Sequence, residues 1–213
     1  MSTFQIKVCG ITRPQDAALA ASLGADMIGM IFYRKSPRFV SRQQALTVIR
    51  ELPITVDKVG VFVNETIENM MKAVEKLELQ WVQIHGGVDR MAIKQLQRRG
   101  VRVIEAFGVD DGTRWTDLAR SRADLILADN ASKETWGGTG KSFDWAKARG
   151  ALPKNLALAG GIDDQNVARA VQTFKQLLVD VNSGVESSPG AKSKPKLKKF
   201  FETCDKLRYG KQD

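Results

Sequence analysis

The chain contains 213 residues, of which 43% are hydrophobic and 27% are charged, and it carries a formal net charge of +9. This composition is typical of a soluble globular protein with enough apolar material for a sizeable core, and no run approaches the roughly 18 to 20 apolar residues that a membrane span needs. With two cysteines and one histidine, neither a disulfide framework nor a zinc site of His and Cys ligands is expected.

Apolar runs of strand length alternate with segments of helical apolar spacing, which predicts eight strand–helix units. The runs span residues 4–9, 26–32, 58–63, 79–84, 101–107, 124–128, 155–159 and 177–182. No linker or low-complexity stretch interrupts them, so we expect an α/β protein with one domain, residues 1–213, folded as a (β/α)8 TIM barrel. An open flavodoxin-like sheet usually has fewer strands, and the GxGxxG of a dinucleotide-binding fold is absent after the first strand.

Several helix starts carry capping signals. Thr12 to Gln15 and Ser41 to Gln44 match the capping box, and Asn64 can cap the following helix, which has a clear apolar stripe. The fifth helix, at about residues 113–121, has a weak pattern and could be a single irregular turn.

The first predicted strand ends at Cys9, and Gly10 follows it. A lone cysteine in a strand is most often a small buried hydrophobe. At the carboxyl end of a barrel strand, however, a thiol can reach a ligand, and nearby cations or helix N-termini can favour the thiolate. Cys9 is therefore a candidate base or nucleophile.

Two further polar residues follow the second and fourth strands. An isolated arginine is usually a surface residue, but the guanidinium of Arg38 can bind a carboxylate bidentately, which makes it a candidate clamp. His85, the only histidine, ends the fourth strand. For His85 a structural role beside the site and direct contact with a ligand both remain open.

Asp129 ends the sixth strand. A carboxylate at a strand end often just caps the following turn, but across the barrel mouth from Cys9 it could donate a proton to a bound molecule. An acid and a base on opposite sides of one substrate suit an isomerisation that moves protons without a cofactor.

Glycine-rich stretches follow the later strands. Residues 138–142 read Gly-Thr-Gly-Lys-Ser, but Thr135 stands where a Walker A loop needs its first glycine. A loop closing over the site is the better functional interpretation of residues 136–145, and a plain turn is the alternative. After strands seven and eight come Gly160 with Gly161, and Ser183 with Gly184. These loops form the recurrent phosphate-binding place of the barrel, where backbone N–H groups hold the anion.

The positive charge is concentrated at the C-terminal end, where residues 191–213 contain eight Lys or Arg and three acids. The lysines are Lys192, Lys194, Lys196, Lys198 and Lys199, at the start of the expected last helix, together with Lys206 and Lys211. Few aromatic residues interleave them, so a solvated helix face is favoured over a nucleic-acid interface. A positive surface would also attract an anionic substrate.

These signatures resemble the phosphoribosylanthranilate isomerase family of tryptophan biosynthesis. The matching stretches are residues 7–12, 32–38, 59–64, 82–86, 127–130, 137–145, 158–161 and 179–186, with Pro189-Gly190. They follow the family's order over nearly the whole chain. The combination of Cys-Gly-Ile-Thr, Gly-Gly-Thr-Gly and Phe-Asp-Trp is specific, because other phosphate-binding barrels do not share it.

The resemblance implies an Amadori rearrangement of N-(5-phosphoribosyl)anthranilate, without metal or organic cofactor. Asp129 would be the general acid and Cys9 the general base, while Arg38 would hold the anthranilate end and Asp180 a sugar hydroxyl. Gly160, Gly161, Ser183 and Gly184 would bind the phosphate. We also place His85 among the substrate-binding residues.

The chain departs from the family pattern at two places. Gly87-Val88 stands where an acidic pair usually follows His85-Gly86, and Ser193 replaces a common Asp. Ser193 can still cap the helix that starts near Pro195, so we expect an effect on local stability only.

Two other functions are weighed against this one. A related sugar isomerase of histidine synthesis performs the same chemistry but normally has Asp where Cys9 stands. A non-catalytic barrel could bind nucleic acid through the lysine-rich last helix. We expect a phosphorylated small molecule as the ligand, no nucleic-acid or membrane partner, and either a monomer or a homodimer. Because residues 1–7 lack the basic start and apolar stretch of a signal peptide, we expect a cytoplasmic protein.

Overall fold

The computed structural model describes residues 4–87, 89–110, 112–130, 152–173 and 178–210. Its eight main strands are β1 (Gln5–Val8), β2 (Met27–Ile31), β3 (Asp57–Val63), β4 (Trp81–His85), β5 (Arg102–Val109), β6 (Leu125–Asn130), β7 (Leu156–Leu158) and β8 (Leu178–Val181). Each lies at the place of a predicted run. They pair in parallel in chain order, and β1 also pairs with β8, which closes the barrel. The predicted barrel fold is therefore confirmed.

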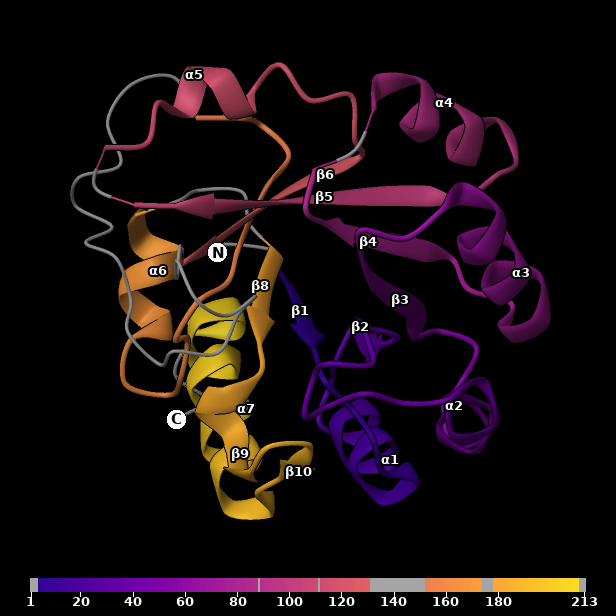
Figure 1. Cartoon of the computed structure of the whole chain (residues 1–213). Coiled ribbons are helices and arrows are strands. Elements are labelled where there is room, and N and C mark those ends of the chain that lie inside the picture. The colour runs from indigo at the N-terminus through magenta and orange to yellow at the C-terminus, as the bar shows by residue number, and fades with distance from the viewer. Residues whose placement is uncertain (1–3, 88, 111, 131–151, 174–177, 211–213) are drawn as a thin grey trace.

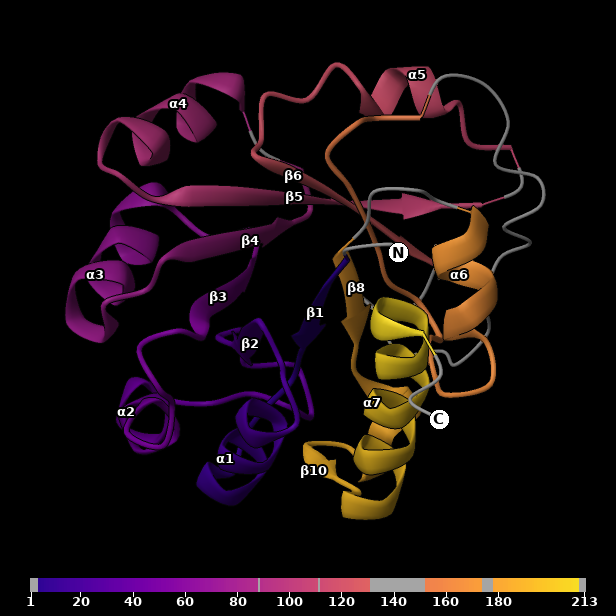
Figure 2. The same cartoon turned by 180° about the vertical axis from the view of Figure 1, so that it is seen from behind.

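The helices lie outside the barrel and follow one another around it (Figure 1). They are α1 (Pro14–Ser22), α2 (Arg42–Ile49), α3 (Ile67–Leu77), α4 (Arg90–Arg98), α5 (Trp115–Leu118), α6 (Val167–Thr173) and α7 (Lys194–Tyr209). Helix α5 has only four residues, in keeping with its weak pattern. In both views α7 lies close to β8, and α6 lies farther from β8 on the same side (Figure 2). No helix of the described ranges combines the length and the apolar character that a bilayer crossing requires.

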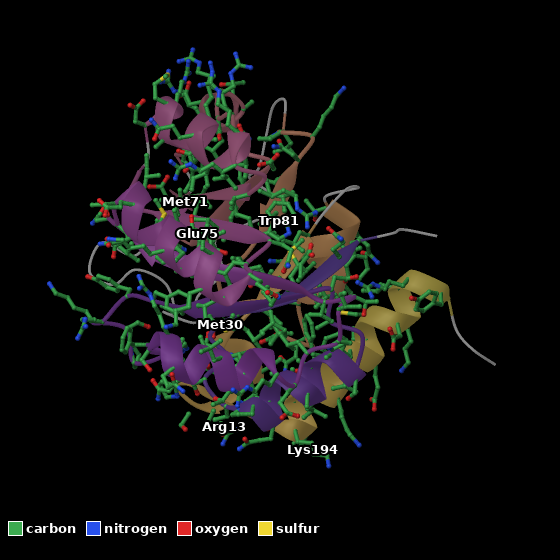
Figure 3. All side chains as sticks on the ribbon, turned by 90° about the vertical axis from the view of Figure 1, so that its right-hand side faces the viewer. Arg13, Met30, Met71, Glu75, Trp81 and Lys194 are labelled. Carbon is green, nitrogen blue, oxygen red and sulfur yellow. The ribbon has the colours of Figure 1, made fainter. Side chains whose placement is uncertain are left out.

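Side chains of each strand alternate between two hydrophobic clusters, as the two-residue period of a strand requires. One cluster, which includes Ile6, Ile28 and Met30, packs between strands and helices. The other fills the barrel interior and consists of Cys9, Met27, Val59, Val61, Trp81, Ile104, Leu127, Ala157, Ala159 and Leu178. Figure 3 labels Trp81 of the inner cluster and Met30 of the outer one. The inner cluster forms an apolar layer below the polar residues at the strand ends.

The predicted helix caps have mixed outcomes. The capping box of Ser41 and Gln44 is confirmed, with both of its hydrogen bonds present. The other two predictions are wrong. Arg13 occupies the N-cap of α1, because Thr12 donates its hydroxyl hydrogen bond to the Gly190 carbonyl instead. Thr66, rather than Asn64, caps α3 by accepting a hydrogen bond from the Asn69 N–H at 3.3 Å.

The segment before α7 differs from its predicted form. A short 3-10 turn, η2 (Ser183–Val185), leads into a hairpin of β9 (Glu186–Ser188) and β10 (Ala191–Lys192). Lys192 lies in this hairpin and is buried, so placing it on a solvated helix face is wrong. Ser193 is the N-cap residue of α7 but its side chain makes no capping hydrogen bond, so its predicted capping role is also wrong.

The remaining lysines at the start of α7 behave as predicted. Lys194, Lys196, Lys198 and Lys199 are all exposed. Figure 3 shows Lys194 at the lower edge of the molecule, at the lower end of α7. Lys199 pairs with Asp164 at 2.7 Å, and Lys196 donates to the Glu186 carbonyl. These contacts fix the helix against the hairpin and the loop that precedes α6.

Candidate active site

A cavity of about 480 Å³ opens at the carboxyl ends of the barrel strands. Of the residues predicted for the site, Cys9, Arg38, His85, Asp129, Gly160, Gly161, Asp180 and Ser183 line it. Gly184 does not belong to the lining. The barrel thus brings eight of the nine predicted residues to one concave surface, as convergence of the strand ends at one rim requires.

Cys9 follows β1 directly and its side chain belongs to the barrel interior. The Cys9 N–H donates to the Val181 carbonyl at 2.9 Å, which continues the β1–β8 ladder to the rim. Gly10 then turns the chain with a φ of +69°, where an added Cβ would lie 2.6 Å from Asn182 Oδ1. Burial raises the pKa of the Cys9 thiol, and the Lys7 ammonium opposes that rise.

Lys7 and Asp180 form an ion pair beneath the cavity. Their Cα atoms are register partners in β1 and β8, and Lys7 Nζ lies 2.8 Å from Asp180 Oδ2. Burial raises the pKa of Asp180 and the Lys7 charge opposes the rise. The other oxygen, Asp180 Oδ1, is buried without a hydrogen-bond partner among the described residues. Because Asp180 lines the cavity, this oxygen can accept a hydrogen bond from a ligand.

Gln83 and His85 project from β4 toward the same cavity, since both line it. Gln83 Nε2 and His85 Nε2 lie 2.8 Å apart. Burial and the Lys7 charge lower the pKa of His85 from 6.5 to about 4, so the imidazole is neutral near pH 7. Gln83 Oε1 is buried and unpartnered within the part of the chain that the structure describes. The pair thus offers neutral polar atoms to a ligand.

Asp129 reaches the cavity from the other side of the barrel. It lies near the end of β6, in register with Gly108 of β5, and is half-buried. Its odd-numbered neighbours on the strand, Leu125 and Leu127, pack with the inner cluster. The alternation of the strand therefore turns the Asp129 carboxylate inward and above that apolar floor.

Arg38 is engaged by a carboxylate of the chain itself. Its Nε lies 3.0 Å from Glu186 Oε1 and its Nη2 lies 2.7 Å from Oε2, which is bidentate geometry. Lys192 Nζ also contacts Glu186 Oε1, at 2.9 Å. Burial raises the pKa of Glu186, but the two cations outweigh it and leave the pKa below its ordinary value. This network joins the loop after β2 to the hairpin after β8.

The glycine-rich loops after β7 and β8 lie against each other. Gly160 and Gly161 have φ values of +83° and +69°, which favour glycine over residues with a Cβ. Gly184 approaches the loop after β7 so closely that an added Cβ would lie 2.0 Å from the Ile162 carbonyl oxygen. Gly184 thus lets the two loops meet, although it does not line the cavity. The glycine-rich loop predicted at residues 136–145 lies outside the described residues.

Over residues 6–203 the sequence matches the family described as "N-(5'phosphoribosyl)anthranilate (PRA) isomerase". The N-(5'-phosphoribosyl)anthranilate isomerase of Listeria monocytogenes serotype 4a is 42% identical over 201 residues, covering 93% of this chain and 97% of the relative. The chain belongs to the phosphoribosylanthranilate isomerase family. Its membership decides against the histidine-pathway isomerase and the non-catalytic barrel.

Solved structures agree with this assignment. The crystal structure of the isomerase from Thermus thermophilus has a TM-score of 0.85 and 31% identity, covering 96% of this chain and all of that one. A family structure in complex with reduced 1-(o-carboxyphenylamino)-1-deoxyribulose 5-phosphate has a TM-score of 0.81 and 32% identity, with 95% and 99% covered. A structure of monomers made from the dimeric isomerase of Thermotoga maritima has a TM-score of 0.79 and 32% identity, again with 95% and 99% covered.

This phosphoribosylanthranilate isomerase acts in tryptophan biosynthesis. The sequence does not assign a role to several polar residues in or beside the site, among them Lys7, Gln83 and Glu186. Lys7 and Gln83 lie at the inward-facing positions of strands that otherwise look apolar, where a period of two is the only signal. Glu186 lies 148 residues from its partner Arg38, and no local pattern predicts such a pair.

The stability of the isomerase should decrease as the pH is lowered, because the folded chain holds His85 neutral. The pKa of His85 is about 4 in the folded chain, against an ordinary value of 6.5. Between these pH values the unfolded chain therefore binds the proton more strongly, so acidification favours unfolding, by up to about 3 kcal/mol at the low end. Urea unfolding of wild type and His85→Gln from pH 7.5 to 4 measures this. The stability difference between the two proteins should be constant above pH 6.5 and change steadily below it, whereas parallel curves would contradict the assignment.

Proposed function

We propose that Cys9 is the general base and Asp129 the general acid of the isomerisation. The observation that carries this proposal is that a thiol and a carboxylate line one cavity from β1 and β6, two strands that do not pair with each other. A substrate in that cavity would lie between them. General acid and base groups placed in this way typically contribute about 10² to 10⁴ each to the rate.

The two groups divide the rearrangement into two proton transfers. Asp129 protonates the furanose ring oxygen, and the C1–O bond breaks as the nitrogen lone pair forms a C=N bond, giving the open-chain Schiff base. The Cys9 thiolate then removes the proton on C2, and the electrons of the C–H bond give an enolamine. Tautomerisation of the enolamine yields the ketone, 1-(2-carboxyphenylamino)-1-deoxyribulose 5-phosphate. One proton is supplied and one is removed, so the isomerisation is balanced.

The phosphate group is assigned to the two glycine-rich loops. Gly160, Gly161 and Ser183 line the cavity, and Gly184 packs the loop after β8 against the loop after β7. Backbone N–H groups at glycines can approach phosphate oxygens closely, and the Ser183 hydroxyl adds a donor. The family structure that contains a phosphorylated, reduced product analogue supports a phosphorylated ligand for this chain.

The remaining contacts fix the other parts of the substrate. Arg38 lines the cavity while its Nε and Nη2 hold Glu186, so we assign the carboxylate of the anthranilate ring to the rest of its guanidinium. Asp180 Oδ1, buried and without a partner in the described residues, is assigned to a sugar hydroxyl. We assign His85 to a neutral hydrogen bond with the substrate, because its lowered pKa keeps the ring uncharged.

Replacing Glu186 by glutamine tests whether Arg38 must be held in place. The amide cannot keep the bidentate contact, so Arg38 should lose its fixed position and KM should rise about tenfold, with kcat changing less. Steady-state kinetics on Glu186→Gln measure the split. Asp164→Asn is the matched control, because Asp164 pairs with the exposed Lys199 of α7 and does not line the cavity, so both constants should stay unchanged. A fall in kcat at constant KM would contradict the assignment.

The activity assay follows the loss of anthranilate fluorescence as phosphoribosylanthranilate, generated in situ, is consumed. Wild type, Cys9→Ser and Asp129→Asn are run side by side with the same batch of substrate. Turnover by wild type that depends on both residues would support the proposed roles. Full turnover by either variant would overturn the role of that residue.

We further propose that residues 1–213 form a single cytoplasmic domain and that two chains form a homodimer, as in the dimeric isomerase of Thermotoga maritima. Light scattering during gel filtration tests the assembly. A mass of twice 23.5 kDa would support the dimer, and a mass of 23.5 kDa would contradict it.

A further inference from the structure

Lys7 occupies a position where a lysine is rarely found. Its side chain is fully buried in the barrel, with 0% of its surface exposed. It precedes Cys9 by two residues, so both side chains belong to the inner face of β1. Lys7 does not line the cavity. Even a paired buried ammonium often stabilises a fold no more than apolar residues of similar volume would, so packing alone does not account for this lysine.

Asp180 accounts for only part of the hydrogen-bonding capacity of Lys7. The ammonium carries three donors, and one of them is directed at Asp180 Oδ2 at 2.8 Å. Asp180 in turn leaves its Oδ1 without a partner among the described residues. A purely structural pair would be expected to satisfy both of its partners, because unpaired buried polar atoms are costly. This pair is instead left open toward the cavity.

The Lys7 ammonium and the Cys9 thiol lie next to each other beside Gly29 of β2. A Cβ added to Gly29 would lie 2.9 Å from Cys9 Sγ and 3.1 Å from Lys7 Nζ. The missing side chain of Gly29 thus leaves one space into which both groups point. The third nearest atom is the Cα of Cys9, so all three nearest atoms belong to Cys9 and Lys7.

The charges around the thiol have opposite effects on its ionisation. Burial raises the pKa of Cys9, Lys7 is the largest influence in the other direction, and Asp180 adds to the rise. Lys192 also lowers the pKa, as the least of these causes. Conversely, burial lowers the pKa of Lys7, but Asp180 and Cys9 together keep it above its ordinary value, so the ammonium stays charged.

We propose that Lys7 is a positioning residue that stabilises the thiolate form of Cys9 and thereby makes a buried thiol usable as a base. Asp180 holds the ammonium at one end and Gly29 leaves the space in which it meets the sulfur. This inference rests on the proposed role of Cys9 as the general base. It assigns the inner lysine of β1 to the chemistry rather than to the packing of the barrel.

The test measures the reactivity of the Cys9 thiol directly. Iodoacetamide alkylates thiolates, so the alkylation rate against pH gives the ionisation of Cys9 without substrate. Cys204→Ala serves as the background, which leaves Cys9 as the only cysteine. In Lys7→Met we expect the midpoint to move up by at least about one pH unit, which is about a tenfold slower reaction at any pH below it. Lys58→Met is the matched control, because Lys58 is a β3 lysine paired with exposed Glu78, and its profile should not move.

A second pair of variants keeps the test decisive if Lys7→Met is too unstable to fold. Asp180→Asn removes the carboxylate that Lys7→Met would leave buried and unpaired. The comparison is then Asp180→Asn against the double variant Lys7→Met, Asp180→Asn. The midpoint of the alkylation profile of Cys9 should be lower in Asp180→Asn than in the double variant by at least about one pH unit. Equal midpoints in both comparisons would overturn the inference and leave Lys7 with a structural role.

The outcome is separable from the fate of the proposed function. If Cys9→Ser retains full turnover, the proposed base is wrong whatever the alkylation profiles show. If Cys9→Ser abolishes turnover and Lys7→Met leaves the alkylation midpoint unchanged, only the inference about Lys7 fails. The proposed base and the inference about Lys7 are both supported if turnover requires Cys9 and if Lys7→Met raises the midpoint of the alkylation profile and lowers kcat.

Discussion

Replacing Cys9 by serine is expected to lower kcat by a factor of about 10² to 10⁴, the range typical for loss of a general base. A serine hydroxyl fits the same space but has no accessible anion near neutral pH, so it cannot take the C2 proton. Ligand binding should persist, because the residues assigned to the phosphate lie in the loops after β7 and β8. The measurement is the fluorescence assay together with titration of a phosphorylated product analogue.

Cys204→Ser is the matched control for this substitution. Cys204 is the other cysteine of the chain and is buried in α7, away from the cavity lining. Its replacement places a hydroxyl in a packed helix interface, so stability should fall while kcat stays unchanged. If Cys9→Ser folds normally but no longer binds the analogue, the role of Cys9 is in binding and the proposed base is wrong.

Replacing Asp129 by asparagine should lower kcat by a similar factor of about 10² to 10⁴. The amide keeps the shape of the side chain and can still donate a hydrogen bond, but it cannot deliver a proton to the ring oxygen. The substrate therefore binds and its ring stays closed. Single-turnover measurements should show a normal amplitude of binding followed by a slow loss of fluorescence.

Asp124→Asn is the control for Asp129, because the same strand segment carries both carboxylates. Asp124 precedes β6 and accepts a hydrogen bond from the Val103 N–H at 2.8 Å, at the end of the strand away from the cavity. An asparagine oxygen can still accept that bond, so a modest loss of stability and a normal kcat are expected. A fall in kcat for Asp124→Asn equal to that for Asp129→Asn would mean that β6 is distorted in both variants.

Much of this fold can be predicted from the sequence because barrel strands are apolar on two faces. Runs such as 26–32 and 58–63 coincide with β2 and β3 to within a residue. Helix caps were less predictable, since Thr12 finds its partner in the Gly190 carbonyl, a group brought near only by the finished fold. Lys192 was misplaced for a similar reason, because a hairpin of three and two residues has too few positions for a periodic pattern.

The sequence predicts the site residues that stand at strand ends. It does not predict a residue that acts by contacting another side chain. Cys9, Asp129 and His85 stand at strand ends, and their position alone brings them to the rim. Lys7 lies one layer deeper, and Asp180, its partner, is 173 residues away in the sequence. Nothing in the local sequence relates these two residues, whereas the β1–β8 register makes them direct neighbours.

The pairing of β1 with β8 also bears on when the protein becomes active as it is made. Lys7 and Cys9 are synthesised well before Asp180, so at that stage the lysine has no counter-ion and the first strand has an unpaired edge. Arg208 of α7 then binds the Phe4 carbonyl and Asp26, at 2.7 Å each, and ties the end of the chain to its beginning. A chain that stops before β8 therefore carries Lys7 and Cys9 but lacks both the counter-ion of the lysine and the strand that closes the barrel.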